Sequence, residues 1–440
     1  MNNKIKVGYS WFGPGGPMWN TELPNVLSFA NVSDGALTHS HKFWCDDTHR
    51  FFNNRKDLFE TYPTFNLDAY DDHGPFIIPF TVSCRMYLHE YFRAPDGILE
   101  FAHLSRGVVD KVRDGNGYIL IEHGVEAYMY NDALHSMHSY FQHVQRIPLH
   151  KIIYLTGAMN CKEVYEDYCQ RHNIPDNKEN RLTILPYPSS INIFKEQMKD
   201  EPFYNTETVP EKLFLMWNRR LGVGRNHRVA LLLQLEKLGL VDRSYISCPD
   251  YNVDVPTLKF SELYSPGYMT AFPGITEEII ETFANRLPLV LDGIQDVNQM
   301  CSDEGNVNRP YYQNSLISLI TETNFDNAEV TLTEKSFKPL KEKHPFIIAG
   351  VNGALKAMRE LGFETFSEFW DEGYDLCPDP SMRIRMIADV LADIGKWDHA
   401  QIIDFKRRVK PKLEHNFKVL NEIGLDPILT KIYDIVWNQK

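Results

Sequence analysis

Residues 332–340 place an acid and a base at the start of an expected helix. Their sequence is LTEKSFKPL, in which Thr333 suits the N-cap position and Glu334 and Lys335 fall in the first turn. A helix start presents N–H groups that can hold a phosphate, and Lys335 adds a positive charge there. Glu334 can accept hydrogen bonds from a ribose diol, so the segment has the features that a nucleoside diphosphate requires. A capped surface helix with a polar face explains the same residues, and spacing alone leaves both interpretations open.

A second cluster of charge follows a strand-like run at residues 213–217. Gly222 and Gly224 interrupt it and permit a close approach of the backbone to an anion. The G-x-G pattern lacks the third glycine of a dinucleotide fingerprint, and the phosphate-binding P-loop pattern is absent. The segment therefore indicates an anion cradle or a solvated basic turn. Its potential cations are Arg219, Arg220, Arg225, His227 and Arg228.

Two further groups of polar residues follow apolar runs. Glu322, Thr323 and Asn324 end the run at 316–321, and Glu322 and Asn324 are candidate contacts for a ligand. In the first half of the chain, the run at 117–121 leads to the candidate catalytic residues Glu122, His123 and Glu126. A carboxylate that is desolvated at such a place has a raised pKa and can act as a general base. The same acids can instead cap a loop.

The apolar pattern that must position these residues is that of two α/β domains. Short apolar runs alternate with amphipathic segments in both halves, which indicates parallel sheets. A polar stretch at 195–210, ending in a proline, separates the halves. We expect a first Rossmann-like domain at 1–195, a second at 209–375 and helices at 376–440 that pack on or between the domains. Ligands are expected in a cleft between the domains, at the carboxyl ends of the strands.

The individual elements follow from the same pattern. In the first half we expect strands at 4–9, 117–121, 151–155 and 182–185, and helices near 54–60, 94–110 and 162–172. In the second half we expect strands at 213–217, 244–247, 288–292, 316–321 and 345–349, and helices at 226–237, 276–285, 334–341 and 353–361. The closing helices are expected at 382–394, 400–419 and 427–437.

Composition excludes several classes of protein. The 440 residues are 43% hydrophobic and 24% charged, which is typical of a globular protein and excludes disorder and coiled coil. Seven cysteines, an odd number without a CxxC pair, indicate neither a disulfide framework nor structural zinc. The net charge of −13 disfavours bulk binding to nucleic acid. No apolar run approaches the roughly 20 residues of a membrane span, so we expect a cytoplasmic protein.

No metal site is expected. The acidic stretches at 45–47 and 68–72 could hold a cation, but neither follows a strand of the second domain. His135 and His138 have the i, i+3 spacing of a metal pair on a helix, but without a carboxylate partner we interpret them as solvated.

At this point the residues show a resemblance to known families. NSLISLITETNF at 314–325, followed by LTEKSFKPLKEKHPFIIAG at 332–350, resembles the donor-binding signature of α1,3-fucosyltransferases. In that family a strand ending in Glu-Asn-Ser precedes a Thr-Glu-Lys helix and a Pro-Val-Val strand. Most of 212–375 also resembles glycosyltransferase-like proteins of bacteriophages. That second resemblance rests on Asn218-Arg219-Arg220, the Thr-Glu-Lys helix and FWDEGYD at 369–375.

The resemblance implies the GT-B fold, in which two Rossmann-like domains face each other and the second holds the nucleotide-sugar. It implies that Glu334 binds the ribose, that Lys335 and Arg219 or Arg220 neutralise the diphosphate, and that Glu322 approaches the donor sugar. Asn324 takes the place of the motif asparagine. Thr323 interrupts the Glu-Asn-Ser order, and Lys338-Pro339 replace Asn-Ala, so the donor is left open between GDP- and UDP-linked sugars.

The expected function is therefore a glycosyltransferase without a cofactor. Inversion follows from the resemblance, and independence from metal follows because protein cations can stabilise the departing diphosphate. Glu126 is the preferred base, because the phage-type proteins also have an acid a few residues after the corresponding strand. The acceptor is expected to be a glycan; a hydroxymethylated pyrimidine of phage DNA, with the protein in the cytoplasm of the host, is the alternative. A non-catalytic nucleotide-binding scaffold is the third interpretation, and the sequence leaves the oligomeric state open.

Overall fold

The computed structural model describes residues 4–8, 52, 55–62, 74–81, 106–123, 129, 131–191, 201–218, 221, 225–252, 255–260, 274–291 and 308–438. The chain divides into two compact units, Met1–Tyr187 with Gly424–Lys440 and Pro188–Ile423. The limits expected from the sequence were 1–195, 209–375 and 376–440. In the structure the boundary lies after Tyr187, and the last helix is grouped with the first unit.

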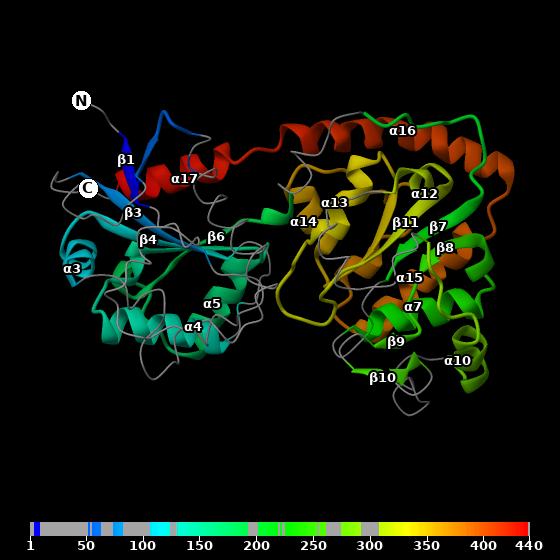
Figure 1. The fold of residues 1–440 in the computed structure, drawn as a ribbon, viewed down its shortest axis with the longest axis horizontal. Coiled ribbons are helices and arrows are strands. Elements are labelled where there is room, and N and C mark those ends of the chain that lie inside the picture. The colour runs from blue at the N-terminus through cyan, green and yellow to red at the C-terminus, as the bar shows by residue number, and fades with distance from the viewer. Residues whose placement is uncertain are drawn as a thin grey trace, which may run out of the picture. The chain divides into compact units, whose positions relative to one another are not determined.

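The first unit is built on a six-stranded parallel sheet in the order β2-β1-β3-β4-β5-β6 (Figure 1). Its central strands pair in register, with Ile121 of β4 beside Phe80 of β3 and Tyr154 of β5. The strands are β1 (Ile5–Gly8), β2 (Phe59–Tyr62), β3 (Phe76–Thr81), β4 (Gly117–His123), β5 (Ile152–Thr156) and β6 (Thr183–Pro186).

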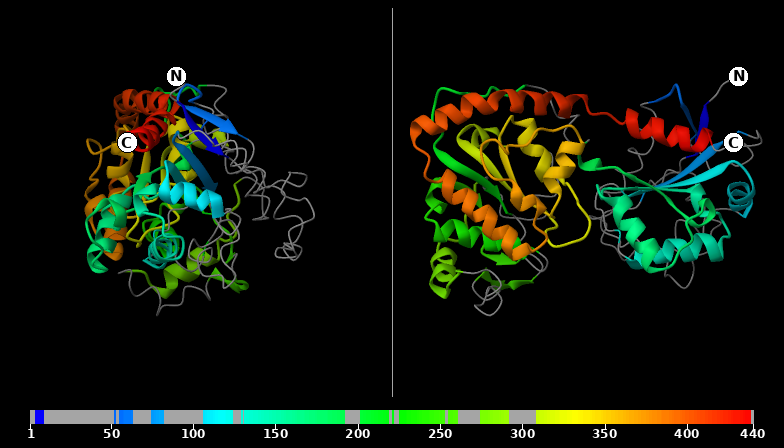
Figure 2. Two further views of the ribbon diagram at one scale, coloured as in Figure 1. Left: turned by 90° about the vertical axis from the view of Figure 1, so that its left-hand side faces the viewer. Right: turned by 180° about the vertical axis from the view of Figure 1, so that it is seen from behind.

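Alternate residues of β4 enter two different apolar clusters, because successive side chains of a strand point to opposite faces. Ile119 and Ile121 join the cluster formed with helices α3 (Arg106–Asp114), α4 (Asn131–His138) and α5 (Cys161–Arg171). Tyr118 and Leu120 join the cluster that contains residues of α17 (Asp426–Trp437). The C-terminal helix therefore covers one face of this sheet, and α4 and α5 cover the other (Figures 1 and 2).

The second unit is built on a four-stranded parallel sheet in the order β12-β11-β7-β8. All seven residues of β11 are buried, as expected for a central strand covered on both faces. The short strands β9 (Tyr251–Asn252) and β10 (Val255–Lys259) form a separate antiparallel pair. The sheet strands are β7 (Lys212–Trp217), β8 (Ser244–Ser247), β11 (Ser315–Thr321) and β12 (Phe346–Ala349).

Helices cover both sides of this second sheet. Figures 1 and 2 show α16 along one side of the unit and α15 beside α7 on the other. Helix α7 is buried at every position from His227 to Leu235, which explains why its apolar residues show no single stripe. The helices are α7 (Asn226–Lys237), α10 (Glu277–Ala284), α12 (Arg309–Gln313), α13 (Glu334–Lys341), α14 (Ala354–Glu360), α15 (Pro380–Ile394) and α16 (His399–Glu422).

Short helical turns connect these elements. The π-helical turn is η5 (Ser139–Val144), and the 3-10 turns are η6 (Leu149–Lys151), η7 (Lys178–Asn180), η8 (Ser189–Ile191), η9 (Val241–Arg243) and η11 (Gly373–Leu376). Among the described helices, none combines the length and the apolar composition needed to span a bilayer.

The expected fold class is confirmed: both units are α/β with parallel sheets, and the chain ends in helices. Two expected elements are wrong. Residues 55–58 form a turn and residues 59–62 form β2, because Phe59 and its neighbours pair with β1 and this pairing outweighs local helix preference. The strand expected at 288–292 is reduced, in its described part, to a single bridge between Leu289 and Cys248. The helix expected at 94–110 begins, within the described residues, at Arg106.

Candidate functional site

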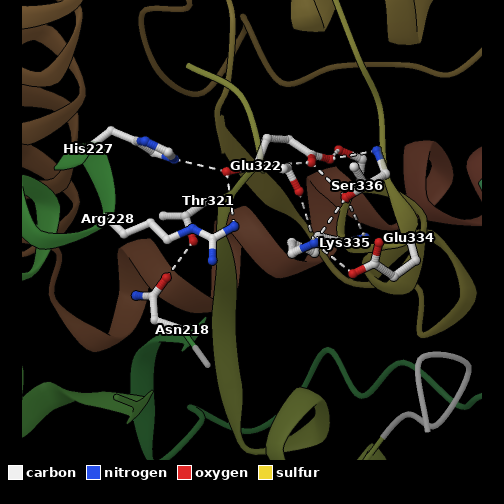
Figure 3. Close-up of polar contacts among 10 residues, drawn as sticks. Asn218, His227, Arg228, Thr321, Glu322, Glu334, Lys335 and Ser336 are labelled. Carbon is white, nitrogen blue, oxygen red and sulfur yellow. Dashed lines mark hydrogen bonds and ion pairs between the residues drawn. The ribbon is translucent and has the colours of Figure 1, made fainter. Parts of the chain in front are cut away.

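The carboxyl ends of β7, β11 and β12 meet at one edge of the second sheet, because the three strands are neighbouring and parallel. Asn218 follows β7, Glu322 follows β11 and Gly350 follows β12. The loop after β11 returns to the same edge as the start of α13. Figure 3 shows the polar contacts that join these segments.

The side chain of Glu322 lies wholly inside this edge and is 0% exposed. Its carboxylate accepts hydrogen bonds from the N–H of Thr323 (3.1 Å) and the N–H of Thr333 (3.0 Å). It also accepts from the Thr333 hydroxyl (2.6 Å) and the Ser336 hydroxyl (2.5 Å). Four donors thus compensate the buried charge without a cation among them. The carboxylate therefore lies at the start of α13. The resemblance, in contrast, implied that Glu322 approaches the donor sugar.

The main-chain carbonyl of Glu322 is held from the opposite direction by α7. His227 Nε2 donates to this oxygen at 2.9 Å, and Arg228 Nη2 donates to it at 3.2 Å (Figure 3). The bond to a carbonyl fixes the proton of His227 on Nε2. Burial, together with the charge of Arg228, lowers the pKa of His227 well below its ordinary value, so the ring is neutral.

The loop after β11 is also fixed by a buried arginine of α15. Arg383 Nη1 donates to the carbonyls of Phe325 (2.9 Å) and Gly350 (2.8 Å), and its guanidinium lies 4.4 Å from the Phe325 ring centroid. The other face of that loop contacts His227, whose ring stacks on Phe325 at 4.7 Å. Burial lowers the pKa of Arg383, and the negative charges of Asp375, Asp326 and Asp379 oppose this shift.

The start of α13 brings the predicted acid and base together. Thr333 is the N-cap, and its hydroxyl oxygen accepts from the N–H of Lys335 at 3.4 Å. Lys335 Nζ donates to Glu334 (2.7 Å), Thr333 Oγ1 (3.3 Å) and Thr323 Oγ1 (3.5 Å). Its side chain keeps 27% exposure, so the ammonium group remains within reach of a ligand.

The ionisation of Glu334 is set by its neighbours. Burial by itself raises its pKa, but the charges of Lys335 and Lys338 outweigh burial and lower the pKa of Glu334 to about 2. Glu334 is therefore a carboxylate at any physiological pH, and its Oε1 accepts a hydrogen bond from Lys335. A diol that donates to it would find the Lys335 ammonium group beside it.

Asn218, at the carboxyl end of β7, is the third residue at this edge of the sheet. Its Oδ1 accepts from the Thr321 hydroxyl at 2.6 Å, which leaves the Nδ2 amide group as a donor facing away from that bond. Asn218 is 0% exposed, and its Nδ2 has no hydrogen-bond partner among the residues that the structure describes. The side chain thus holds two unused N–H donors at the strand end that precedes Arg219 and Arg220 in the sequence.

The segment FWDEGYD at 369–375, which carries part of the resemblance, makes hydrogen bonds within this unit. Asp375 accepts from the N–H of Leu355 (2.8 Å) and the N–H of Lys356 (3.0 Å), so it caps the start of α14. Glu372 accepts from the N–H of Phe366 and the hydroxyl of Thr365, at 2.6 and 2.8 Å. Burial raises the pKa of both acids. Both acids are engaged inside the unit rather than presented to a ligand.

In the first unit, two of the three candidate bases lie in the described part. Glu122 and His123 end β4, and both are buried. His123 Nδ1 lies 2.9 Å from the Tyr154 hydroxyl, and burial lowers the pKa of His123 to about 4. Glu126 lies outside the described residues.

The structure thus brings Glu322, Thr333, Glu334 and Lys335 into one cluster. Asn324 borders it and bonds to the Thr331 hydroxyl at 3.4 Å. Arg219 and Arg220 lie outside the described residues. The sequence interpretation missed the roles of Ser336, Asp375 and Arg383. Only Ser336 carried a local signal, since it stands three residues after the N-cap.

The interpretation of both histidines as solvated is wrong for His138. This side chain is 6% exposed, and its Nε2 lies 2.9 Å from the Tyr165 hydroxyl, because α4 packs against α5. Among the described residues, no three His, Cys, Asp or Glu side chains are grouped so that they could hold a metal ion. The acidic stretches at 45–47 and 68–72 lie outside the described residues.

Comparisons with known proteins gave structural matches alone. No protein-family model and no curated protein matches the chain. A UDP-forming α,α-trehalose-phosphate synthase from Burkholderia xenovorans matches with a TM-score of 0.42 and 10% identity over 91% of this chain and 79% of that one. The enzyme from Burkholderia vietnamiensis matches with a TM-score of 0.41 and 13% identity over 83% and 74%. A trehalose-6-phosphate synthase described as transferring with retention matches with a TM-score of 0.41 and 12% identity over 87% and 83%. At these values the matches assign neither a family nor an activity to this chain.

Proposed function

We propose that this chain is a glycosyltransferase that moves a sugar from a nucleotide-diphosphate sugar to an acceptor hydroxyl. The observation that carries the proposal is the placement of the Glu334–Lys335 pair at the carboxyl end of β11. Open α/β sheets bind their ligands at this edge. The Glu334 carboxylate can accept hydrogen bonds from a ribose diol, and the Lys335 ammonium group beside it can pair with the adjoining diphosphate. The side chain of Lys335 is partly exposed, which leaves it accessible to this ligand.

The diphosphate is placed between Lys335 and the start of α7. The starts of α13 and α14 already hold the carboxylates of Glu322 and Asp375, which satisfy their N–H groups internally. The first turn of α7 has no acidic residue, and its N-cap Arg225 makes no side-chain cap. The positive end of this twelve-residue helix favours an anion.

The cations around the start of α7 strengthen this placement. Arg219 and Arg220 stand seven and six residues before its first residue in the sequence, and Arg228 lies in its first turn. Arg228 reaches the carbonyl of Glu322, while Lys335 reaches the hydroxyl of the next residue, Thr323, so α7 and α13 approach the same two residues. We therefore assign Lys335 and Arg219 or Arg220 to the diphosphate, Glu334 to the ribose and Asn324 to the border of the donor pocket.

Glu322 takes a different role in this proposal from the one that the resemblance implied. Its four internal hydrogen bonds leave it no lone pair aimed at solvent, and it is fully buried. We assign it to positioning: it fixes the start of α13, and through Thr333 it fixes the backbone that carries Glu334 and Lys335.

The chemistry proposed here needs no metal, because protein cations would stabilise the charge on the departing GDP or UDP. Inversion is carried over from the fucosyltransferase resemblance. It requires a general base, for which Glu126 is the first candidate and Glu122 and His123 are the others. A glycan is the proposed acceptor, since the net charge of −13 opposes a DNA backbone.

The test is a binding panel of GDP, UDP, CDP and dTDP in the presence of a chelator, read by calorimetry and thermal shift. A nucleotide that binds the folded state raises the unfolding temperature, so the preferred base is identified directly. Lys335→Ala should weaken the preferred nucleotide by about 1.5–3 kcal/mol, or roughly ten- to a hundredfold. Lys356→Ala is the matched control, because Lys356 is exposed on α14 and pairs with Glu360 of the same helix.

Two results would contradict the proposal. Absence of binding with all four nucleotides would remove the donor pocket, and equal affinity in Lys335→Ala and Lys356→Ala would remove Lys335 from it. A nucleotide-binding scaffold would show the expected affinities but no transfer or hydrolysis of the matching nucleotide-sugar. Transfer to hydroxymethylated DNA in place of glycans would select the alternative acceptor.

A further inference from the structure

The second unit has a hollow of about 240 Å³ away from the sheet edge described above. One side is a stripe of α15 with helical spacing, and residues 369–371 and Trp397 complete it. The stripe consists of Met386, Asp389, Val390, Asp393 and Ile394. Residues three and four apart lie on the same face of a helix, so the carboxylates and the apolar side chains run side by side along it.

The interior of the hollow is apolar and aromatic. Val390, Ile394 and Trp370 are buried, and Phe369 and Trp397 add two further aromatic side chains. A ring cluster holds these walls in place: Phe405 lies 4.9 Å from Phe369 and 5.1 Å from Trp397. The walls are therefore pre-formed.

The mouth of the hollow is acidic. Asp371, Asp389 and Asp393 are exposed, in contrast to the buried residues behind them. Lys396 pairs with Asp393 at 2.8 Å, but both side chains are about three-quarters exposed, with 74% and 76% exposure, so this pair offsets little of the charge. Within the described part of the chain these acids do not form a group able to ligate one metal ion. An extended organic cation, in contrast, can contact acids that are spaced along a helix.

The side chains that line the hollow favour a ligand that donates hydrogen bonds. Its side chains supply three carboxylates and aromatic faces, and the two indole N–H groups are the only side-chain donors among them. An ammonium group donates three hydrogen bonds and accepts none, and it is attracted to an aromatic face. Arg408 already lies over the Phe369 ring at 5.1 Å, which is one such contact within the chain.

From this arrangement we propose that the hollow binds an aliphatic diamine or polyamine. One ammonium group lies among Asp371, Asp389 and the aromatic walls, the methylene stem packs on Met386 and Val390, and a second ammonium group reaches Asp393 one turn along α15. The volume is below the ~300–1,000 Å³ of sites for drug-sized ligands, which suits a thin alkyl chain. This inference is independent of the proposed sugar transfer.

The experiment is calorimetric titration of the full chain with 1,5-diaminopentane and with spermidine at low salt. We expect a Kd on the order of 1 mM or tighter, weakening as salt screens the exposed carboxylates. 1,5-Pentanediol has the same stem without charge and should give no measurable heat. Asp389→Asn should weaken the diamine about 2- to 5-fold, and Trp397→Ala by a similar factor.

Glu414→Gln is the matched control, since Glu414 is an exposed acid of α16 that pairs with Lys410 outside the hollow. Asp389 is exposed, so its substitution should leave the fold intact even if Trp397→Ala does not fold. The proposal is overturned if neither amine binds, if pentanediol binds as well as the diamine, or if Asp389→Asn and Glu414→Gln have the same affinity. Each outcome can be obtained without any nucleotide or sugar, so it leaves the proposed transfer activity untouched.

Discussion

The carboxylate of Glu322 holds Thr333 twice, accepting from its N–H at 3.0 Å and from its hydroxyl at 2.6 Å. The residue that ends β11 thereby fixes the residue that begins α13. Since Glu334 and Lys335 follow directly, the acid–base pair proposed to bind the donor is located by a buried structural carboxylate. The relationship gives a general expectation: changes at Glu322 should act on the donor site through the position of α13.

A double-mutant cycle tests this coupling. Ser336→Ala removes one donor to the buried carboxylate and should cost about 1–3 kcal/mol of unfolding free energy. Glu322→Gln should cost more, because an amide nitrogen would face the hydroxyl and N–H donors. The double variant should lose less than the sum, by about 0.5–3 kcal/mol. Denaturant unfolding measures all three, and Ser367→Ala, an exposed serine, should change stability by less than about 0.5 kcal/mol. Simple additivity would show that Ser336 and Glu322 do not act together.

Stability in acid should report on Glu334. Its pKa is about 2 in the folded protein against an ordinary 4.5, so the folded state releases this proton more readily. The resulting stabilisation is present above pH 4.5 and is lost as the pH falls from 4.5 towards 2, in total about 3 kcal/mol. Glu334→Gln should lack this part of the pH dependence when unfolding free energies are compared across the range. Glu360→Gln, at an exposed acid of α14, should retain it. Identical profiles for the two variants would contradict the assigned ionisation.

Buried histidines should make the stability of the protein depend on pH in a second range. Burial lowers the pKa of His344 to about 4 from an ordinary 6.5, although its hydrogen bond to the carbonyl of Ser315 opposes the shift. The unfolded chain therefore binds a proton that the folded state does not, and stability falls as the pH decreases from 6.5 towards 4. His344→Gln should reduce the slope of unfolding free energy against pH by about one proton in this range. His399→Gln, at an exposed histidine, is the control variant and should retain the contribution of His344 to the slope. An unchanged slope in His344→Gln would mean that His344 is not the titrating group.

Asp375 should contribute to stability by capping α14 rather than to catalysis. Asp375→Asn keeps the size of the side chain but removes the charge that faces two N–H groups of the helix start, at a cost of about 1–2 kcal/mol. Thermal unfolding measures the cost, and nucleotide affinity should be unaffected. A large loss of affinity with little loss of stability would place Asp375 in the donor site instead.

Much of the second unit could be predicted from its sequence. The helices at 226–237 and 334–341 were located at their observed limits, because apolar runs bounded by polar caps and turns are local signals. The pairing of Glu334 with Lys335 at a helix start was predictable for the same reason. The first unit is less predictable: the sequence pattern predicts a helix near 54–60, whereas Phe59 and Glu60 belong to a strand because they pair with β1.

The partners of the buried acids could not have been predicted. Glu322 and Ser336 are fourteen residues apart, and Arg383 is thirty-three residues from the carbonyl of Gly350 that it binds. No spacing rule connects such positions, so the sequence was interpreted with Glu322 facing a ligand, whereas folding turns its carboxylate into α13.

By itself the sequence determined the alternation of strands and helices, the two parallel sheets and the acid–base pair that opens α13, because these depend on the order of neighbouring residues. Only the tertiary structure decided which charged side chains are buried and which remain available to a ligand. It buried Glu322 and Asp375 against helix starts, left Lys335 partly exposed, and brought the acids of α15 beside the aromatic residues 369 and 397. The physical reason is that a charge taken out of water must find its partners wherever the chain brings them, and that place is fixed only when the whole unit has folded.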